Sequence, residues 1–166
     1  AALGHFVHLP PHPLYPLLGG AIRIKDLVEA VKRKGMDSVA VTGHGNLCGA
    51  IDFYKAARAA GVKPILGMEA YVAGEKGRQD RSERLGRHLI LLATNAEGWA
   101  NLRYLSSMAF TAGYYYDPRI DKQLLREHSP GLVGLTACLA REAPRPRRQG
   151  DMDRARRAPR ASKAIF

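Results

Sequence analysis

Hydrophobic residues recur at helical spacing in several stretches of the chain. In the first stretch Ile24, Leu27, Val28 and Val31 stand at positions i, i+3, i+4 and i+7, which places them on one face of a helix. Basic residues fill the last turn of this helix, and Gly35 follows it where a left-handed C-terminal cap is expected. The same kind of spacing predicts further helices over 46–61, 96–110 and 122–128.

The caps and the inward faces of the later helices can also be predicted. Asn95 and Asp121 precede the third and fourth helices, where their side chains can accept hydrogen bonds from free backbone amides. In the third helix we expect Trp99, Leu102 and Leu105 to face the core. In the second helix the residues expected to face inward are Leu47, Ala50, Ile51, Tyr54 and Ala57.

Short apolar runs between these helices have the length and composition of buried strands. They lie at 5–9, 38–42, 63–74, 88–93 and 131–140. Strand and helix alternate with short connections, and a polar loop without apolar periodicity covers 74–87. This pattern predicts an α/β fold with a largely parallel sheet, either open or closed into a barrel. Little order is expected after about residue 143, where Pro159 interrupts the remaining helical pattern.

Length and charge narrow the class of protein. A chain of 166 residues fits one domain, and no apolar run approaches the roughly 18 residues that a membrane-spanning helix needs. Two distant cysteines suggest no disulfide framework, so we expect a cytoplasmic protein. The net charge is +11, and residues 141–166 alone hold nine Arg or Lys against three Asp or Glu. This balance favours a polyanionic partner such as nucleic acid, although a solvated basic tail has the same composition.

Candidate metal ligands fall near the ends of the predicted strands. They are His12, His44, Glu69, His88 and Cys138. Imidazole, carboxylate and thiolate donors together suit zinc, manganese or iron. Functional side chains gather at the C-terminal ends of parallel strands, so a shared metal site is one interpretation of these residues. The other interpretation is a set of separate structural side chains.

The aromatic run 114–116, followed by Arg119, also has two interpretations. Exposed rings and a guanidinium group could stack on nucleic-acid bases. The same residues could instead pack a loop against the rim of a barrel, which we favour because such runs commonly anchor loops.

Several motifs resemble one protein family in their order and spacing. They are AVTGHGNLCGAIDFYKAARAAGVKPILGMEAYV at 40–72, HLILLATNAEGWANL at 88–102, SSMAFTAGYYYDPRIDKQLL at 106–125 and GLVGLTACLAREAP at 131–144. Together they closely resemble the N-terminal polymerase-and-histidinol-phosphatase (PHP) domain of bacterial DNA polymerase III alpha subunits. The segment GYYYDPRIDKQLL is similar to the main replicative branch of that family rather than to its error-prone paralogue.

The resemblance implies both a fold and a range of activities. The fold is a distorted (β/α)7 TIM-like barrel, here incomplete at its C-terminus, with 1–143 as the barrel and 144–166 as a basic helical tail of the same domain. In family members with an intact site, a polynuclear metal centre hydrolyses a 3′-terminal phosphodiester as a 3′–5′ exonuclease. In others the domain is structural, bracing the polymerase and contacting the proofreading exonuclease subunit.

Carried over one position at a time, the family's metal site is incomplete in this sequence. The positions that match family ligands are His12, His44, Glu69, His88 and Cys138. The family's histidine is replaced by Pro10, and its aspartates are replaced by Gly19 and, beside His44, by Gly43. The last metal motif of the family, an Asp-x-His, is expected beyond residue 166.

The loss of metal-ligand donors lowers the expectation of a metal-dependent activity. A cluster of divalent ions needs bridging carboxylates to offset the repulsion between its cations, and too few remain. We therefore expect the exonuclease or phosphoesterase activity to be lost, with no assignable catalytic residue. We expect no cofactor, or at most one residual zinc or manganese ion. The substitutions run towards Pro, Gly and Arg, which is the direction expected of drift in a GC-rich genome or of sequencing error.

Three functional hypotheses follow. In the first, the chain is a fragment of a DNA polymerase III alpha subunit, a DNA-directed DNA polymerase and hence a nucleotidyltransferase. Its partners would be DNA, the downstream polymerase domain, the proofreading exonuclease subunit and other replisome subunits, with no membrane. The second is a free-standing, metal-dependent phosphoesterase similar to histidinol phosphatases. The third is a non-enzymatic nucleic-acid-binding module that would use Arg145, Arg147, Arg148, Arg154, Arg156 and Arg157.

Overall fold

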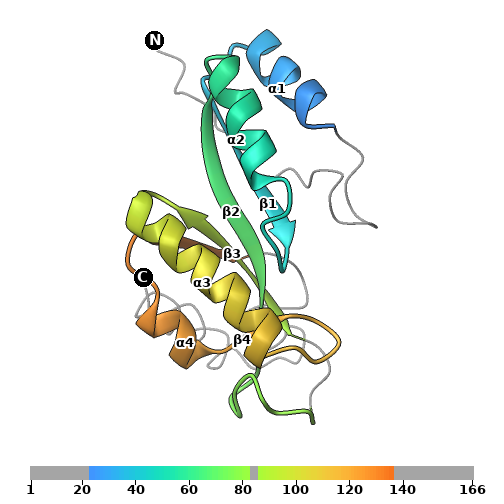
Figure 1. Cartoon of the computed structure of the whole chain (residues 1–166), viewed down its shortest axis with the longest axis vertical. Coiled ribbons are helices and arrows are strands. Elements are labelled where there is room, and N and C mark those ends of the chain that lie inside the picture. Colours follow the sequence, from blue (N-terminus) through green and yellow to red (C-terminus); the bar gives the residue numbers. More distant parts are fainter. Residues whose placement is uncertain (1–22, 83–85, 137–166) are drawn as a thin grey trace, which may run out of the picture.

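The computed structural model describes residues 23–82 and 86–136 (Figure 1). Its elements in chain order are α1 (Ile24–Arg33), β1 (Ser38–His44), α2 (Ala50–Ala59), β2 (Lys63–Val72), β3 (Arg87–Ala93), α3 (Ala96–Ala112), β4 (Arg119–Ile120), α4 (Lys122–Glu127) and β5 (Leu132–Thr136). The predicted alternation of helix and strand is confirmed in these ranges, with β4 as an addition. The predicted strand at 5–9 and the tail at 144–166 lie outside the described residues.

The strands form one mixed sheet with β2 at its centre. The strand order is β1-β2-β3-β5, and β4 pairs with the end of β2. β1 and β4 run parallel to β2, whereas β3 runs antiparallel to β2 and β5 antiparallel to β3. The prediction of a largely parallel sheet is therefore wrong for β3. The physical reason is its connection: the described part of the loop from β2 to β3 (73–82 and 86) contains no helix, and the chain returns along the neighbouring position instead of crossing over the sheet.

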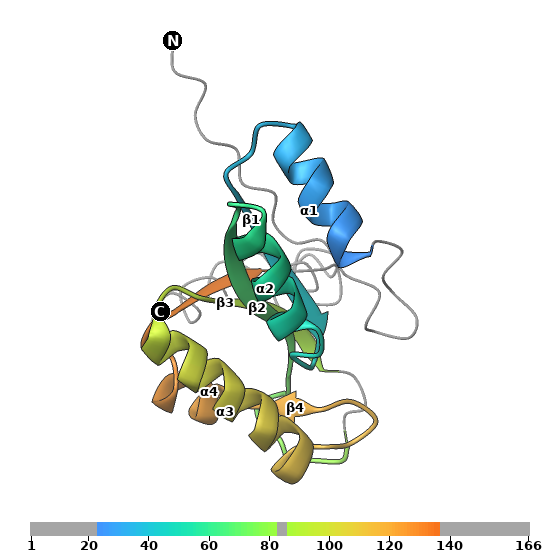
Figure 2. The ribbon, with the colours of Figure 1, turned by 45° about the horizontal axis from the view of Figure 1, so that its top comes forward.

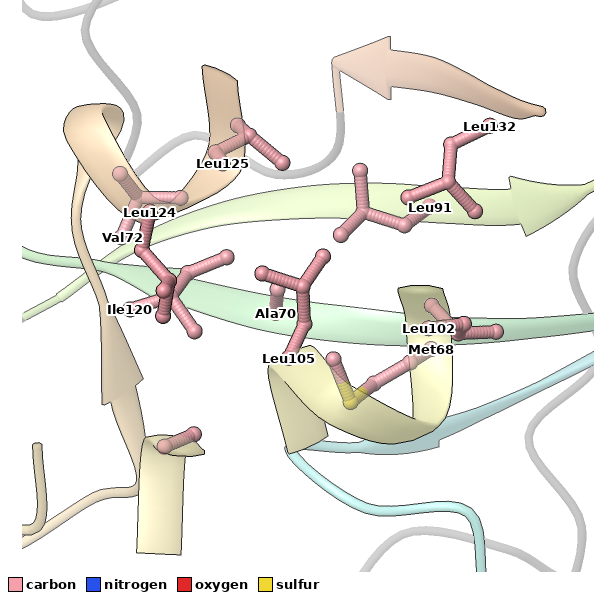
Figure 3. Close-up of a cluster of buried hydrophobic side chains, with 11 residues drawn as sticks. Met68, Ala70, Val72, Leu91, Leu102, Leu105, Ile120, Leu124, Leu125 and Leu132 are labelled. Atoms are coloured by element: carbon pink, nitrogen blue, oxygen red, sulfur yellow. The ribbon is translucent and has the colours of Figure 1, made fainter. Parts of the chain in front are cut away.

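All the described helices pack on the same face of this sheet (Figures 1 and 2). Near β1, α1 and α2 contribute Leu27, Val28, Val31, Phe53 and Ala57 to a core that includes Val39 and Val41. Over β2 and β3, α3 and α4 contribute Leu102, Leu105, Leu124 and Leu125, which surround Met68, Ala70 and Leu91 (Figure 3). Side chains alternate along a strand, so these strand residues share the helix-covered face.

The caps at the ends of the helices lie where the sequence predicts them, except at the start of α2. The Asn95 side chain accepts a hydrogen bond from the Gly98 amide, and Asp121 accepts one from the Leu124 amide, each at 2.8 Å. The α1 C-terminal turn is closed by Gly35 with a φ of 69°.

The second helix begins later than predicted. It starts at Ala50, and Gly49 precedes it in the left-handed conformation. This start turns Ala50, Phe53 and Ala57 towards the sheet. Ile51 and Tyr54 are consequently 54% and 46% exposed, so the prediction that they face the core is wrong. The face of α2 that contains Phe53 packs against the sheet instead.

The opposite face of the sheet is divided along the strands. One part is apolar, with Ala40, Ile90 and Leu92 buried in a small cluster. Every second position of β1, β2 and β3 projects to this face, and towards the end of β1 these positions become polar, with Thr42 followed by His44. This polar part contains the candidate site.

Candidate functional site

Three of the predicted ligands meet at one edge of the sheet. His44 is the last residue of β1 and lies directly opposite Glu69 of β2 in the strand register. His88, the second residue of β3, pairs with Tyr71, which is two positions beyond Glu69. Because alternate residues share a face, all four side chains project from the face that the helices leave free.

The antiparallel direction of β3 explains how His88 reaches this edge. In a parallel strand its position at the start would place it at the edge opposite His44. In β3 the start lies beside the ends of β1 and β2, so His88 comes to the same edge as Glu69. The structure brings these three residues to one location, for a topological reason that the sequence did not reveal.

One buried carboxylate joins the two histidines. Nδ1 of His88 lies 2.5 Å from Oε1 of Glu69, and Nδ1 of His44 lies 3.5 Å from Oε2. Glu69 is only 4% exposed, whereas the histidine side chains retain 23% (His88) and 30% (His44) exposure. With Glu69 ionised, its carboxylate only accepts hydrogen bonds, and Nδ1 of His88 is then the donor in the shorter contact. We call this group the His44–Glu69–His88 cluster.

The geometry of the cluster differs from that of a metal centre. Ligands at about 2.0–2.1 Å from a tetrahedral zinc ion are roughly 3.3 Å apart. The contact between His88 and Glu69 is shorter than this and is a direct hydrogen bond. Within 23–82 and 86–136, no group of three His, Cys, Asp or Glu side chains is arranged to hold an ion. As placed here, these residues do not fit a metal ion.

The remaining sequence-predicted site positions lie outside the described residues. These are His12 and Cys138 among the candidate ligands, Pro10 and Gly19 among the lost ones, and the tail arginines between 145 and 157.

Tyr71 is a member of the site that the sequence analysis missed. Its ring meets the His88 ring edge-on, with centroids 4.9 Å apart and an interplanar angle of 85°. Glycines make room for it, since a Cβ at Gly86 would lie 2.9 Å from the Tyr71 Cβ. A tyrosine within an apolar strand is usually taken as core. The signal that could have found it is its spacing of two from Glu69.

The segment after α3 holds the loop that follows β2 in place, mainly through contacts of Arg119. Arg119 is 2% exposed, and its Nη2 donates to the carbonyl oxygens of Arg78 at 2.9 Å and Asp80 at 2.8 Å. Its guanidinium group also lies 5.0 Å from the centre of the Tyr115 ring. Arg119 is therefore enclosed by protein, which supports the loop-packing interpretation for this residue. Tyr114 and Tyr116 remain 56% and 55% exposed.

Asp121, two residues after Arg119, also holds this loop in place through hydrogen bonds. Its Oδ2 accepts hydrogen bonds from Nη1 of Arg78 at 2.7 Å and from the Arg78 amide at 3.2 Å. Burial alone would raise the pKa of Asp121, but the hydrogen bonds from the Leu124 amide and from Arg78 outweigh it and hold this pKa below its usual value. The loop that leaves the site edge is thus tied to the start of α4.

Comparison with known proteins identifies the family. The PHP domain family matches residues 8–166. This chain belongs to the PHP domain family. The PHP chain is 50% identical over 137 residues to DNA polymerase III subunit alpha of Helicobacter pylori strain J99, which covers 82% of this chain and 11% of that protein. It is 46% identical over 165 residues to the subunit of the same name from Treponema pallidum, covering 97% of this chain and 14% of that one.

The PHP chain therefore spans only a small part of the length of these relatives. Among solved structures, an amidohydrolase from Chromobacterium violaceum matches with a TM-score of 0.42 and 17% identity, over 61% of this chain and 34% of that one. A match at this level is too weak to support a comparison of function. In the described parts of the chain, none of the helices has the length and apolar character needed to cross a membrane.

Proposed function

We propose that the chain is part of the PHP domain of a bacterial replicative DNA polymerase III alpha subunit and that its role there is structural. The similarity to alpha subunits over most of the chain supports the assignment to this kind of subunit. Polymerisation would belong to the remainder of the longer protein, acting in the cytoplasm with DNA, the proofreading exonuclease subunit and other replisome subunits. In the complete domain, strands added at the edges of β1 and β5 would close the distorted (β/α)7 barrel.

We further propose that this domain has lost the metal-dependent 3′–5′ exonuclease or phosphoesterase activity of its family. The observation that carries this proposal is that both oxygens of Glu69 face histidine nitrogens. A two-metal mechanism needs carboxylates that are free to bridge cations and to clamp the attacking and leaving oxygens. The replacements at Pro10 and Gly19 point the same way, since each stands at a ligand position of the family, and Gly43 replaces the aspartate next to His44.

A nuclease assay on the whole chain tests this loss of activity. The chain is incubated with Zn²⁺ or Mn²⁺ and a 3′-labelled single-stranded DNA, and its metal content is measured by mass spectrometry. We expect no cleavage above the level given by the His44→Ala variant. Metal-dependent cleavage that is lost in His44→Ala but kept in His128→Ala would overturn the proposal. One bound ion without cleavage would agree with a residual zinc or manganese site at which turnover is lost.

The basic tail would contribute to DNA binding separately from the structural role of the domain. Its arginines between 145 and 157 would add sequence-independent contacts to nucleic-acid phosphates. Replacing those six arginines with glutamine should lower DNA affinity in the full chain, most strongly at low salt. Equal affinity of the variant and the wild-type chain at low salt would contradict this contribution.

A further inference from the structure

Exposed cations gather at the end of the sheet opposite the His44–Glu69–His88 cluster. We call this surface the basic end, and its residues are Lys32, Arg33, Lys34, Arg58 and Lys63. The first three come from the C-terminus of α1, the fourth from the last turn of α2 and the fifth from the start of β2.

The topology of the fold brings these three segments together. β1 and β2 are parallel, so both strands begin at the same edge of the sheet. Each is preceded by a helix that runs back along the sheet and ends at that edge, as the adjacent upper ends of α1 and α2 in Figure 1 show. The Lys63 amide donates to the Asp37 carbonyl oxygen at 2.7 Å, which holds the start of β2 beside the connection from α1 to β1.

The cations of the basic end have no anionic partners in the described part of the chain. None of the five takes part in an ion pair within residues 23–82 and 86–136. At the other end of the molecule the situation differs. Arg78 pairs with Asp121 at 2.7 Å, Lys122 pairs with Glu75 at 2.7 Å, and Arg119 is enclosed by carbonyl oxygens. Arg78, Lys122 and Arg119 are thus engaged by oxygen atoms of the chain, whereas the five cations of the basic end form no ion pair within the described residues.

Helix dipoles account for only part of this charge. Each helix C-terminus carries roughly half a negative charge, so α1 and α2 together offset about one cation. Asp37, and Glu29 one helical turn before Arg33, offset up to about two more if their charges act on the whole surface, which leaves an excess of about two positive charges. Lys34 and Lys63 also lie outside the helices. A purely intrahelical role does not explain why all five meet at one edge.

We propose that the basic end binds the phosphate backbone of duplex DNA. Duplex DNA presents a dense row of negative charge, and each neutralised phosphate releases counterions, so several adjacent lysines and arginines suffice for sequence-independent binding. The surface offers long, flexible cationic side chains that can each contact a phosphate, with the Asp37 carboxylate at its margin. This inference rests on charge and placement and is independent of the proposed polymerase role.

Salt-dependent binding of the full chain to DNA tests the proposal. The probe is a fluorescein-labelled duplex of about 20 base pairs, and fluorescence anisotropy gives Kd between about 50 and 200 mM salt. The test variant carries Lys32→Gln, Arg33→Gln and Lys34→Gln. The control carries Lys25→Gln, Lys76→Gln and Arg126→Gln, which removes the same charge from exposed positions elsewhere.

The expected result is a difference in the salt slope. Each lost phosphate contact lowers the slope of log Kd against log salt by about 0.9, so the test variant should lose about 2 to 3 units and the control less than about 1. A second variant, Arg58→Gln with Lys63→Gln, should lose about 1 to 2 units without altering α1. Circular dichroism confirms that each variant is folded. Equal losses in test and control variants, or no salt-dependent binding by the wild-type chain, would overturn the proposal.

Discussion

Glu69 and His88 form a short hydrogen bond across two strands of opposite direction, with Oε1 and Nδ1 2.5 Å apart. The two residues are diagonal neighbours, because Glu69 pairs with Ile90 and His88 pairs with Tyr71 in the register. The bond supplies a partner for a carboxylate that is almost fully buried, and a buried carboxylate without a partner is strongly disfavoured. This hydrogen bond between two predicted ligand positions therefore contributes to the stability of the sheet edge.

Removing His88 should destabilise the domain more than removing His44. His88→Ala leaves Oε1 of Glu69 without its short hydrogen bond, and we expect the free energy of unfolding to fall by about 1–3 kcal/mol. His44→Ala removes a longer, 3.5 Å contact to Glu69 and should have a smaller effect. Urea unfolding at neutral pH measures both. His128→Ala is the comparison variant, since it removes a 3.4 Å contact of Nδ1 to Asn101 and a ring contact with Tyr104 but no bond to a buried carboxylate. Equal effects of all three changes would show that the short bond contributes no particular stability.

Replacing Arg119 should loosen the loop after β2. In Arg119→Met the carbonyl oxygens of Arg78 and Asp80 lose their donor while much of the buried side-chain volume is kept. With two part-buried carbonyl acceptors left without this donor, the expected loss of unfolding free energy is about 1–3 kcal/mol. Thermal unfolding measures this loss, and limited proteolysis should show new cleavage within 74–82. Arg126→Met, at an exposed position of α4, is expected to change neither readout.

Acid should weaken the attachment of this loop through Asp121. The pKa of Asp121 is lower in the folded chain than in the unfolded chain, so its ionised form stabilises the fold. That stabilisation is present above the unfolded value of about 3.9 and is lost as pH falls through the lower folded value. Asp121→Asn retains a helix-capping side chain but removes the charge that Arg78 binds. The stability difference between wild type and Asp121→Asn should therefore shrink between pH 7 and strong acid, as followed by urea midpoints. A difference that stays constant across this range would contradict the assigned role of the charge.

Local structure could be predicted from this sequence because its signals are local. The caps at Asn95 and Asp121 depend on side chains within three residues of the amides they bind, and both are confirmed. The direction of β3 depends instead on how the chain returns across the sheet. An apolar run such as 88–93 has the same pattern in either direction, so periodicity cannot distinguish parallel from antiparallel pairing.

The candidate site was partly predictable for the same reason. Residue chemistry and the family resemblance singled out His44, Glu69 and His88, and the structure places them together. Neither source indicated that Glu69 would hydrogen-bond a histidine directly, because that depends on side-chain distances across the sheet. Burial of Arg119 was also not predictable, since its acceptors are backbone carbonyls about 40 residues away in the sequence.

Restoring the family's aspartate at position 43 should not restore a metal site. A Cβ at Gly43 would lie 2.6 Å from the carbonyl oxygen of Asn46 and 2.9 Å from its Oδ1, so the turn must move to accept any side chain. That turn is held by Asn46, whose Nδ2 donates to the His44 carbonyl oxygen at 2.9 Å and whose Oδ1 accepts from the Cys48 amide at 3.0 Å. We expect Gly43→Asp to reduce the free energy of unfolding by about 1–3 kcal/mol, in the range of other overpacking changes.

The matched variant Gly43→Ala separates crowding from charge. Both substitutions add the Cβ that meets Asn46, but only Gly43→Asp adds a carboxylate beside His44. If crowding dominates, both variants lose similar stability by urea unfolding, and neither gains zinc affinity by titration calorimetry. Zinc binding by Gly43→Asp and not by Gly43→Ala would mean that the turn adapts and that a missing negative charge was the main defect. The expected result is the first, because the Asn46 turn must move before a carboxylate at position 43 can be accommodated beside His44.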